Sequence, residues 1–256
     1  MKNIVLPAAA LLGLLAASPA QTVLIDFGND STYSGVTSPG NWNSMAFGYA
    51  ADLIDSDGNA TTIDWAPVGF GGTDSYNSIV GATTRPHPTP GEISAAQSAL
   101  GGSLGPLAVG EAAIDFYQSD NGISGVGRFQ LEQVTPGQLY NLTFYGTKQY
   151  AGAGNEQTRY SVFDNSLYSN LLASGVLTTG TIDATGNPNS VLTLENVVGP
   201  SNVNNIFYIQ WEGVNDSTQG FINSMSIEVV PEPSTYALLA MAGAAFVGYR
   251  LRRRKG

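Results

Sequence analysis

Apolar and polar residues alternate with a period of two through much of the chain, which is typical of strands that bury one face. In LYNLTFYG, for example, Tyr140, Leu142 and Phe144 lie on the opposite face from Asn141 and Thr143. The alternation predicts roughly ten to twelve strands. The clearest are TVLIDF at 22–27, EAAIDFYQ at 111–118, GRFQLEQV at 127–134, LYNLTFYG at 139–146, TRYSVFD at 158–164, SVLTLENVV at 190–198, IFYIQWEG at 206–213 and FINSMSIEV at 221–229.

Turn-forming residues separate these segments, and a single stretch, EISAAQSAL at 92–100, has the composition of a short helix. Strands that are not interleaved with helices favour an antiparallel arrangement over a parallel α/β sheet. No internal repeat or linker divides residues 21–230. We therefore predict an all-β fold, an antiparallel β-sandwich of jelly-roll type, formed as one domain by residues 21–230.

Composition limits the chemistry of this domain. The chain has no cysteine and one histidine, His87, which lies between two prolines in RPHPTPG. Without cysteine there are no disulfides, no zinc–thiolate sites and no thiol catalysis. A proline-rich loop is a poor place for the buried partner that a catalytic base needs, and no G-x-S-x-G motif is present. We therefore expect that the protein is not an enzyme.

Charge is distributed unevenly along the chain. Six of the ten basic residues lie at position 2 or between positions 250 and 255, so residues 21–230 hold four basic and nineteen acidic residues, a net charge of −15. Affinity for nucleic acids comes mainly from lysine and arginine contacts to phosphate. DNA and RNA are therefore not expected as partners.

The N-terminus has the three parts of a secretory signal peptide. Lys2 supplies the positive region, residues 4–17 are apolar, and Ser18-Pro19-Ala20 is a cleavage site of small residues. We predict a signal peptide over residues 1–20, with the body beginning at Gln21.

The C-terminus reads as a single membrane-spanning helix. Sixteen uncharged residues, 234–249, precede five basic residues between positions 250 and 255. They would form a helix about 24 Å long, to which the basic tail adds effective length. Because positive residues remain on the cytoplasmic side, the body is expected outside the inner membrane and Gly256 inside.

Pro231, Glu232 and Pro233, followed by the apolar stretch and the basic cluster, resemble the PEP-CTERM sorting signal of Gram-negative bacteria. This resemblance implies a sorting segment over residues 231–256 that is recognised and processed by an exosortase, a membrane-embedded peptidase. It also implies an exported protein, anchored in the inner membrane with its body in the periplasm and then delivered to the cell surface or the extracellular matrix. The two prolines restrict φ and favour an extended segment.

The body resembles galactose-binding-like jelly-roll domains in VLIDFG, GNWN, LIDSDGNAT, VTPGQLYNLTFYGT and the FINSMSIEV segment. The resemblance implies a sandwich in which the first and last strands lie close together. It leaves the ligand of the body open.

Two groups of carboxylates are candidate cation ligands, with calcium as the cation. Asp55, Asp57 and Asn59 alternate as in calcium loops, but the EF-hand glycine and the glutamate at position twelve are missing, so a hairpin turn is the favoured alternative. Asp26 in the first strand and Glu228 in the last form the second group if the fold brings them together.

Trp42 is the candidate ligand contact among the three tryptophans. Aromatic rings stack on apolar faces of sugars, but aromatic residues at strand positions are usually core residues. Trp211 fits the core, whereas Trp42 lies in the Gly/Asn-rich GNWN segment. Two functions therefore stay open: a structural or adhesive body in an exopolysaccharide matrix, and a carbohydrate-binding module supported by calcium. A glycosidase or esterase is the weakest alternative.

Overall fold

The computed structural model describes residues 21–28, 36–45, 48–69, 71–74, 78–81, 83–84, 87–119, 125–149, 156–181, 186–215 and 219–231. The chain divides into two units, one of residues 1–20 with 230–256 and one of residues 21–229. All the named elements lie in the second unit, which we call the body. In chain order they are β1 (Thr22–Phe27), β2 (Trp42–Met45), β3 (Asp64–Gly69), β4 (Gly72–Asp74), α1 (Pro90–Ala99), the 3-10 helix η3 (Gly102–Leu107), α2 (Gly110–Ile114), β5 (Phe116–Gln118), β6 (Val126–Glu132), β7 (Leu139–Tyr145), β8 (Gln157–Phe163), β9 (Leu171–Thr178), β10 (Leu192–Val198), β11 (Phe207–Gly213), β12 (Phe221–Ile222) and β13 (Ser224–Val229).

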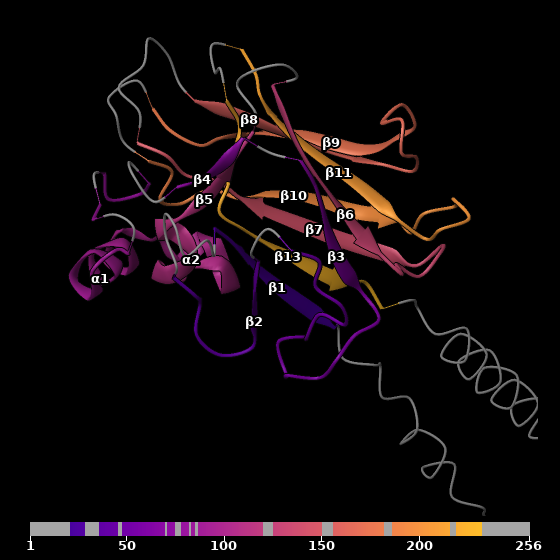
Figure 1. Ribbon diagram of the computed structural model, residues 1–256, viewed down its shortest axis with the longest axis horizontal. Coiled ribbons are helices and arrows are strands. Elements are labelled where there is room, and N and C mark those ends of the chain that lie inside the picture. The colour runs from indigo at the N-terminus through magenta and orange to yellow at the C-terminus, as the bar shows by residue number, and fades with distance from the viewer. Residues whose placement is uncertain are drawn as a thin grey trace, which may run out of the picture. The chain divides into compact units, whose positions relative to one another are not determined.

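Two five-stranded sheets form the body (Figure 1). The first sheet has the order β10-β7-β13-β1-β2 and the second the order β3-β6-β11-β8-β9, while β12-β5-β4 form a small third sheet. The predicted all-β sandwich is thus confirmed. The first and last strands are neighbours, with Thr22 opposite Glu228 and Asp26 opposite Ser224. One pair departs from the antiparallel prediction: β1 and β2 run parallel.

The core lies between the two sheets, and the period-two pattern predicted its main members. Tyr140, Leu142 and Phe144 from the first sheet contact the same cluster as Ile209 and Trp211 from the second. All five are at most 2% exposed. Each fully buried large side chain contributes about 1.5–3 kcal/mol by leaving water, so this interface between the sheets dominates the stability of the fold.

Two segments differ from the single strands predicted for them. Residues 111–118 divide into all but the first residue of α2 and the short strand β5, because Ala112, Ala113 and Ile114 pack as a helical turn rather than along a sheet. Residues 221–229 divide at Asn223 into β12 and β13, which belong to different sheets. The Asn223 amide donates to the carbonyls of Ala113 (3.2 Å) and Asp115 (2.6 Å), so buried hydrogen bonds interrupt the strand.

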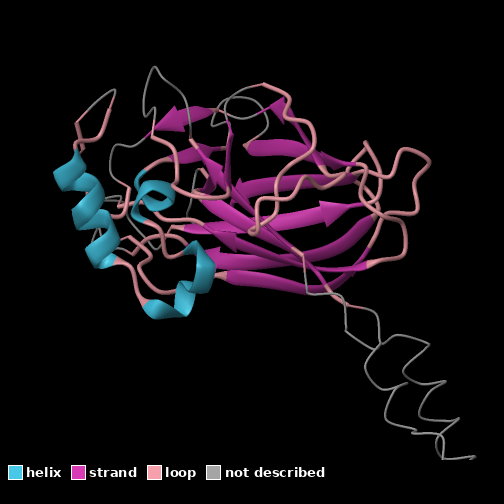
Figure 2. Cartoon of the chain, turned by 90° about the horizontal axis from the view of Figure 1, so that it is seen from below, coloured by secondary structure: helices cyan, strands magenta, loops and turns pink. Residues whose placement is uncertain are grey.

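The helices gather at one end of the sandwich (Figure 2). There they cover the outer face of the first sheet. Leu24 of β1 and Tyr145 of β7 form a second apolar cluster with Leu107 of η3. Helix α1 agrees with the predicted helix at 92–100 to within two residues and begins with a capping box between Thr89 and Glu92.

No helix within the described ranges is long and apolar enough to cross a membrane. The predicted signal peptide at 1–20 and the apolar stretch at 234–249 lie outside those ranges.

Candidate functional site

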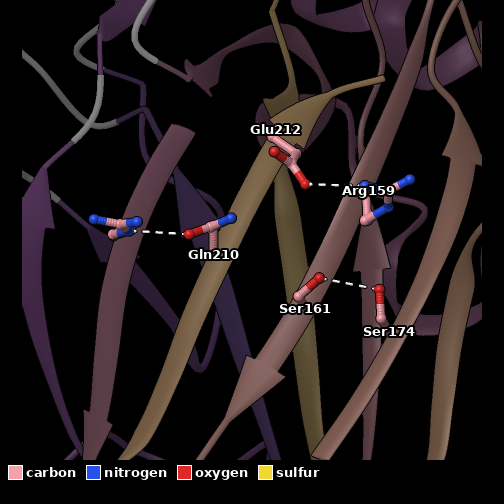
Figure 3. Close-up of polar contacts among 6 residues, drawn as sticks. Arg159, Ser161, Ser174, Gln210 and Glu212 are labelled. Atoms are coloured by element: carbon pink, nitrogen blue, oxygen red, sulfur yellow. Dashed lines mark hydrogen bonds and ion pairs between the residues drawn. The ribbon is translucent and has the colours of Figure 1, made fainter. Parts of the chain in front are cut away.

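The outer face of the second sheet carries basic, acidic, amide, hydroxyl and aromatic side chains. In β6, β8 and β11 the apolar members of each alternating pair enter the core, so the polar members project outward. Figure 3 shows how these outward side chains lie across the neighbouring strands. We call this surface the open face and define it by Arg128, Arg159, Ser161, Phe163, Tyr168, Ser174, Tyr208, Gln210 and Glu212.

Hydrogen bonds across the strands order the polar part of the open face (Figure 3). Arg128 Nε donates to Gln210 Oε1 over 3.0 Å. Arg159 Nη1 forms an ion pair with Glu212 Oε1 at 3.2 Å. The hydroxyls of Ser161 and Ser174 are 3.0 Å apart. These contacts follow from the register, which places Gln210 opposite Arg128 and Glu212 opposite Arg159.

An aromatic cluster continues the open face toward the β8–β9 turn. The Arg128 guanidinium lies 4.1 Å from the ring centroid of Tyr168. The Tyr168 ring meets Phe163 and Tyr208 edge-on, with centroids 5.6 Å and 5.9 Å away. Burial raises the pKa of Tyr168 to about 12, although the charge of Arg128 acts in the opposite direction. Tyr168 is therefore neutral at physiological pH.

The turn that carries Tyr168 is held in place by two polar side chains. Asn165 Oδ1 accepts from the backbone N–H groups of Ser169 (3.0 Å) and Asn170 (3.3 Å), and Tyr168 itself adopts a φ of 53°. Asp164 Oδ1 accepts from the backbone N–H of Ser201, at 2.8 Å, and so ties the turn to the β10–β11 loop. Hydrogen bonds within and around the turn thus fix the position of Tyr168.

This arrangement suits the recognition of polyhydroxylated ligands. Guanidinium, amide and carboxylate groups offer planar donors and acceptors in adjacent rows, and aromatic rings offer apolar surface beside them. The Glu212 carboxylate of the face is engaged by Arg159, and Glu132 lies two positions beyond Gln130 on the outward side of β6.

Sequence reasoning did not select these residues, although a signal for them was present. Arg128 and Arg159 are two of only four basic residues in 21–230, and each precedes an aromatic core residue in an alternating strand. That position alone predicts that both side chains point outward from the sheet.

Trp42, the predicted ligand contact, lies elsewhere. It is the first residue of β2, on the border of the first sheet, opposite Leu24 of β1. Its ring is partly buried and packs against the second apolar cluster below the helices. Trp42 therefore contributes to packing and is not part of the open face.

Asp55, Asp57 and Asn59 form a tight turn. Asp55 Oδ1 accepts from the backbone N–H groups of Asp57 (3.0 Å) and Asn59 (2.8 Å), and Ile54 and Ala60 form a bridge across the turn. The pKa of Asp55 lies below its usual value, chiefly because of the Asn59 N–H. These bonds match the hairpin-turn interpretation, and calcium binding here stays a prediction.

Asp26 and Glu228 are not brought together. They share a face of the β1–β13 pair but are four positions apart in the register, about 13 Å at ~3.3 Å per residue. Glu228 accepts from the amide of Asn141 at 3.2 Å. Asp26 is fully buried and accepts from the Ser38 N–H at 2.9 Å. Burial raises its pKa to about 7, against the hydrogen bonds from Ser38 and Ser44, which lower it.

Within the described ranges no three His, Cys, Asp or Glu side chains group as a metal site.

The C-terminal segment has a match among protein families. Residues 229–255 match the model described as the PEP-CTERM protein-sorting motif. The chain ends in a PEP-CTERM sorting signal. The match begins at the last residue of β13 and includes Pro231, Glu232 and Pro233, of which Pro231 is exposed and the other two lie outside the described ranges.

Solved structures are similar to the body that precedes the PEP-CTERM signal. One, described as "CBM4 structure and function", is 9% identical, with a TM-score of 0.26 over 85% of this chain and 90% of that chain. The xylan-binding domain from CBM 22 is 13% identical, with a TM-score of 0.28 over 46% and 74%. The chain spans only 30% of truncated AlyQ with CBM32 and alginate lyase domains, at 11% identity, a TM-score of 0.29 and 54% of this chain. No curated protein sequence matches the chain.

Proposed function

We propose that this protein is exported through its N-terminal signal peptide and sorted to the cell envelope through its PEP-CTERM signal, where the β-sandwich acts as a structural or adhesive component of the extracellular matrix. The match at residues 229–255 carries the proposal. In the signal, two prolines whose rings restrict φ flank Glu232, and sixteen uncharged residues and a basic tail follow. Such a tail keeps the segment at the outer surface of the inner membrane, where an exosortase can cleave it.

Mass spectrometry of the C-terminus in the native host tests this sorting step. Replacing Pro231, Glu232 and Pro233 by alanine should leave the chain uncut in the membrane, while the wild type is shortened near these residues. A matched control replaces Pro136, which is exposed in a turn of the body, and should leave processing unchanged. Identical C-terminal masses for the triple variant and the wild type would reject processing at this motif.

Protease protection tests the topology. If positive residues keep Gly256 in the cytoplasm, protease added to spheroplasts digests the body. Full protection of the body would contradict export.

The open face favours carbohydrate binding as a second function of the exported body. Its ordered Arg128–Gln210 and Arg159–Glu212 rows and the adjoining Tyr168 ring offer the donors, acceptors and apolar surface that a sugar chain uses. A polysaccharide of the surrounding matrix is the ligand class that matches an exported location.

A glycan array with the released protein tests this function. Gln210→Ala should weaken every signal because it removes an amide from the centre of the open face. Thr143→Ala is the matched control, because Thr143 is a polar outward residue of the first sheet that hydrogen-bonds Thr193 at 3.0 Å. Running the array with calcium and with a chelator also tests the predicted support by Asp55, Asp57 and Asn59. An array without any signal leaves the structural role alone.

A further inference from the structure

The strand registers identify the end of the body from which the chain continues into the PEP-CTERM signal. The last strand, β13, ends at Val229, which lies opposite Tyr140 at the start of β7. The start of β7 also lies opposite the end of β10, with Leu139 opposite Val198. The β6–β7 and β10–β11 loops therefore lie at this end, on the right in Figure 1, and we call it the exit end.

Exposed apolar side chains gather at the exit end. Among the described residues, eight large apolar side chains are exposed, and the five most exposed all lie there. Leu167 and Leu171 stand in the β8–β9 turn and at its end, and Val198 and Val203 stand at the start of the β10–β11 loop and within it. Leu167 is 82% and Val203 97% exposed. We call these four residues the apolar tip.

Tyr49 is the fifth of these exposed residues. Its hydroxyl donates to the carboxylate of Asp64, the first residue of β3. Asp64 lies opposite Glu132, the last residue of β6, so Tyr49 also belongs to the exit end. Single exposed apolar residues are normal on a protein surface, but a group of them marks a surface that contacts another apolar phase.

Hydrogen bonds hold the two connections of the apolar tip in place. Asp164 Oδ1, in the β8–β9 turn, accepts from the Ser201 N–H at 2.8 Å and from Asn202 Nδ2 at 2.9 Å. Asn202 Oδ1 in turn accepts from the Ile206 N–H at 3.2 Å, across the loop that carries Val203. Because the backbone is already ordered, burying these side chains against an external surface costs little further conformational entropy.

The apolar tip is nearly free of charge on an acidic body. Residues 21–230 have a net charge of −15, but segments 164–171 and 198–206 contain one charged residue, Asp164. Its carboxylate is buried and accepts the hydrogen bonds that join the two connections. Anionic surfaces repel the body as a whole, so the tip suits an apolar layer beneath neutral headgroups.

The length of the following chain keeps the exit end close to the predicted membrane span. The uncharged stretch begins at Ser234, five residues after Val229. Five residues reach at most about 18 Å even when fully extended. When residues 234–249 cross the bilayer, the end of β13 therefore stays within about 18 Å of the point where the chain enters the lipid.

We propose that the apolar tip is a membrane-contacting surface that inserts into the interfacial layer of the bilayer. The inference rests on the proposed function, because anchoring of residues 234–249 brings the tip to the lipid. Four side chains give little affinity by themselves, but a covalent tether makes their contact intramolecular, at an effective concentration of about millimolar. Tyr49 adds an aromatic ring of the kind enriched at membrane interfaces.

This contact gives the sorting step a defined geometry. It fixes which end of the body faces the lipid and holds the residues that follow Val229 near the membrane surface. Pro231, Glu232 and Pro233 are then presented to a membrane-embedded peptidase at a constant height.

A fluorescent label tests the proposal in the full chain, which has no native cysteine. Val203→Cys is labelled with a nitrobenzoxadiazole dye and reconstituted in phosphatidylcholine vesicles that contain a spin-labelled lipid. Contact with the bilayer should shift the emission to the blue, and the spin label should quench it about twofold or more. Val68→Cys is the matched control, because Val68 is also exposed but lies toward the other end of β3, and its label should not be quenched.

A label at Ala244→Cys, within the uncharged stretch, reports on the anchor separately. Quenching at positions 244 and 203 but not at 68 supports the proposal. Quenching at 244 alone, or equal quenching at 203 and 68, overturns it and leaves the anchor standing. An absence of quenching at both 244 and 203 contradicts the anchor as well, so the two failures are distinguishable.

Charge substitutions separate apolar contact from electrostatics. Adding Leu167→Asp to Val203→Cys should lower the quenching about twofold or more, because it places a carboxylate in the contact. Val176→Asp adds the same charge at an exposed valine that pairs with Arg159, away from the exit end, and should leave the quenching unchanged. Both positions are exposed, so both variants should keep the wild-type melting curve. Equal losses from the two aspartates would overturn a contact made by the apolar tip.

Discussion

The outer faces of the two large sheets differ in what covers them. The first sheet is partly covered by the helices, and the acid Asp26 lies on the same face of β1 as Leu24 of the second apolar cluster. On the open face of the second sheet, the side chains of Arg159 and Glu212 are 46% and 28% exposed, while Ser161 and Tyr208 are buried by their neighbours. Mutations under the helices should therefore cost as much stability as mutations in the core. Mutations on the open face should cost as little as mutations of surface residues. The expected effects of mutations and pH should follow this difference.

The largest expected effect concerns the buried carboxyl of Asp26. Its pKa is about 7 in the folded protein, above its ordinary 3.8, so the folded state holds a proton that the unfolded state releases between about pH 4 and pH 7. Asp26 therefore stabilises the fold least at neutral pH. Relative to Asp26→Asn, the wild type should lose up to about 4 kcal/mol of unfolding free energy as pH rises across this window.

Urea unfolding of both proteins at several pH values measures this difference. The carboxyls of Asp55 and Asp64 have the opposite pH dependence. The hydrogen bond from the Asn59 N–H lowers the pKa of Asp55. Burial alone would raise the pKa of Asp64, but hydrogen bonds from Tyr49 and the Asp52 N–H bring it below its usual value. Stability from these two acids is present above their ordinary pKa values and is lost in acid. Because both variants retain them, their contribution cancels. Parallel pH profiles would contradict a protonated Asp26.

An effect of similar size is expected from the cavity that Leu107→Ala makes under the helices. Leu107 is fully buried in the second apolar cluster, so its truncation should cost about 2–5 kcal/mol. Val68→Ala on the open side of the second sheet removes a side chain that is 49% exposed, and should cost within about 0.5 kcal/mol. Chemical denaturation compares the two, and equal losses would mean that helix contact does not distinguish the two faces.

Removing the guanidinium of Arg128 should have a smaller effect. Arg128→Ala loses the contact with the Tyr168 ring and the bond to Gln210, together about 1–2 kcal/mol. Arg128→Lys keeps the charge but not the planar stacking group, and should fall between the wild type and Arg128→Ala. Thermal unfolding ranks the three proteins, and a lysine variant as stable as the wild type would show that only charge matters at this position.

The smallest effect is expected for the Arg159–Glu212 ion pair. Its side chains are 46% and 28% exposed, so a double-mutant cycle with alanine should give a coupling of about 0.5 kcal/mol or less. The coupling should shrink further in 1 M salt, where charges are screened within about 3 Å. A coupling that is large and insensitive to salt would contradict this prediction, because it would mean that the ion pair is shielded from water.

The alternation of apolar and polar residues predicted the strands well where one face of the strand packs into the core. Tyr140, Phe144 and Trp211 occupy the inward positions that alternation assigned to them. The same rule was wrong for residues 111–114, because their short apolar side chains suit a helical turn as well as a strand and the neighbouring helices decided between the two. It also missed the division at Asn223, because the hydrogen bonds that interrupt the strand reach residues more than 100 positions away.

The candidate sites show the same limit. Alternation can say that Arg128 and Arg159 point outward, but only strand order places Gln210 and Glu212 beside them. Trp42 lies in a Gly/Asn-rich segment that is typical of a loop, yet parallel pairing with β1 puts it against apolar residues. Asp26 and Glu228 lie on paired strands as the resemblance implied, and the register separates them.

The sequence by itself determined the fold class, the inward faces of the strands and the PEP-CTERM signal, because each depends on residues that are neighbours along the chain. Tertiary structure decided which strands are borders, which outer face the helices cover and which polar side chains meet. Those features depend on sheet order and register, which are set by packing between segments far apart in the sequence. The open face is therefore a property of the assembled sandwich, although every residue in it was visible in the sequence.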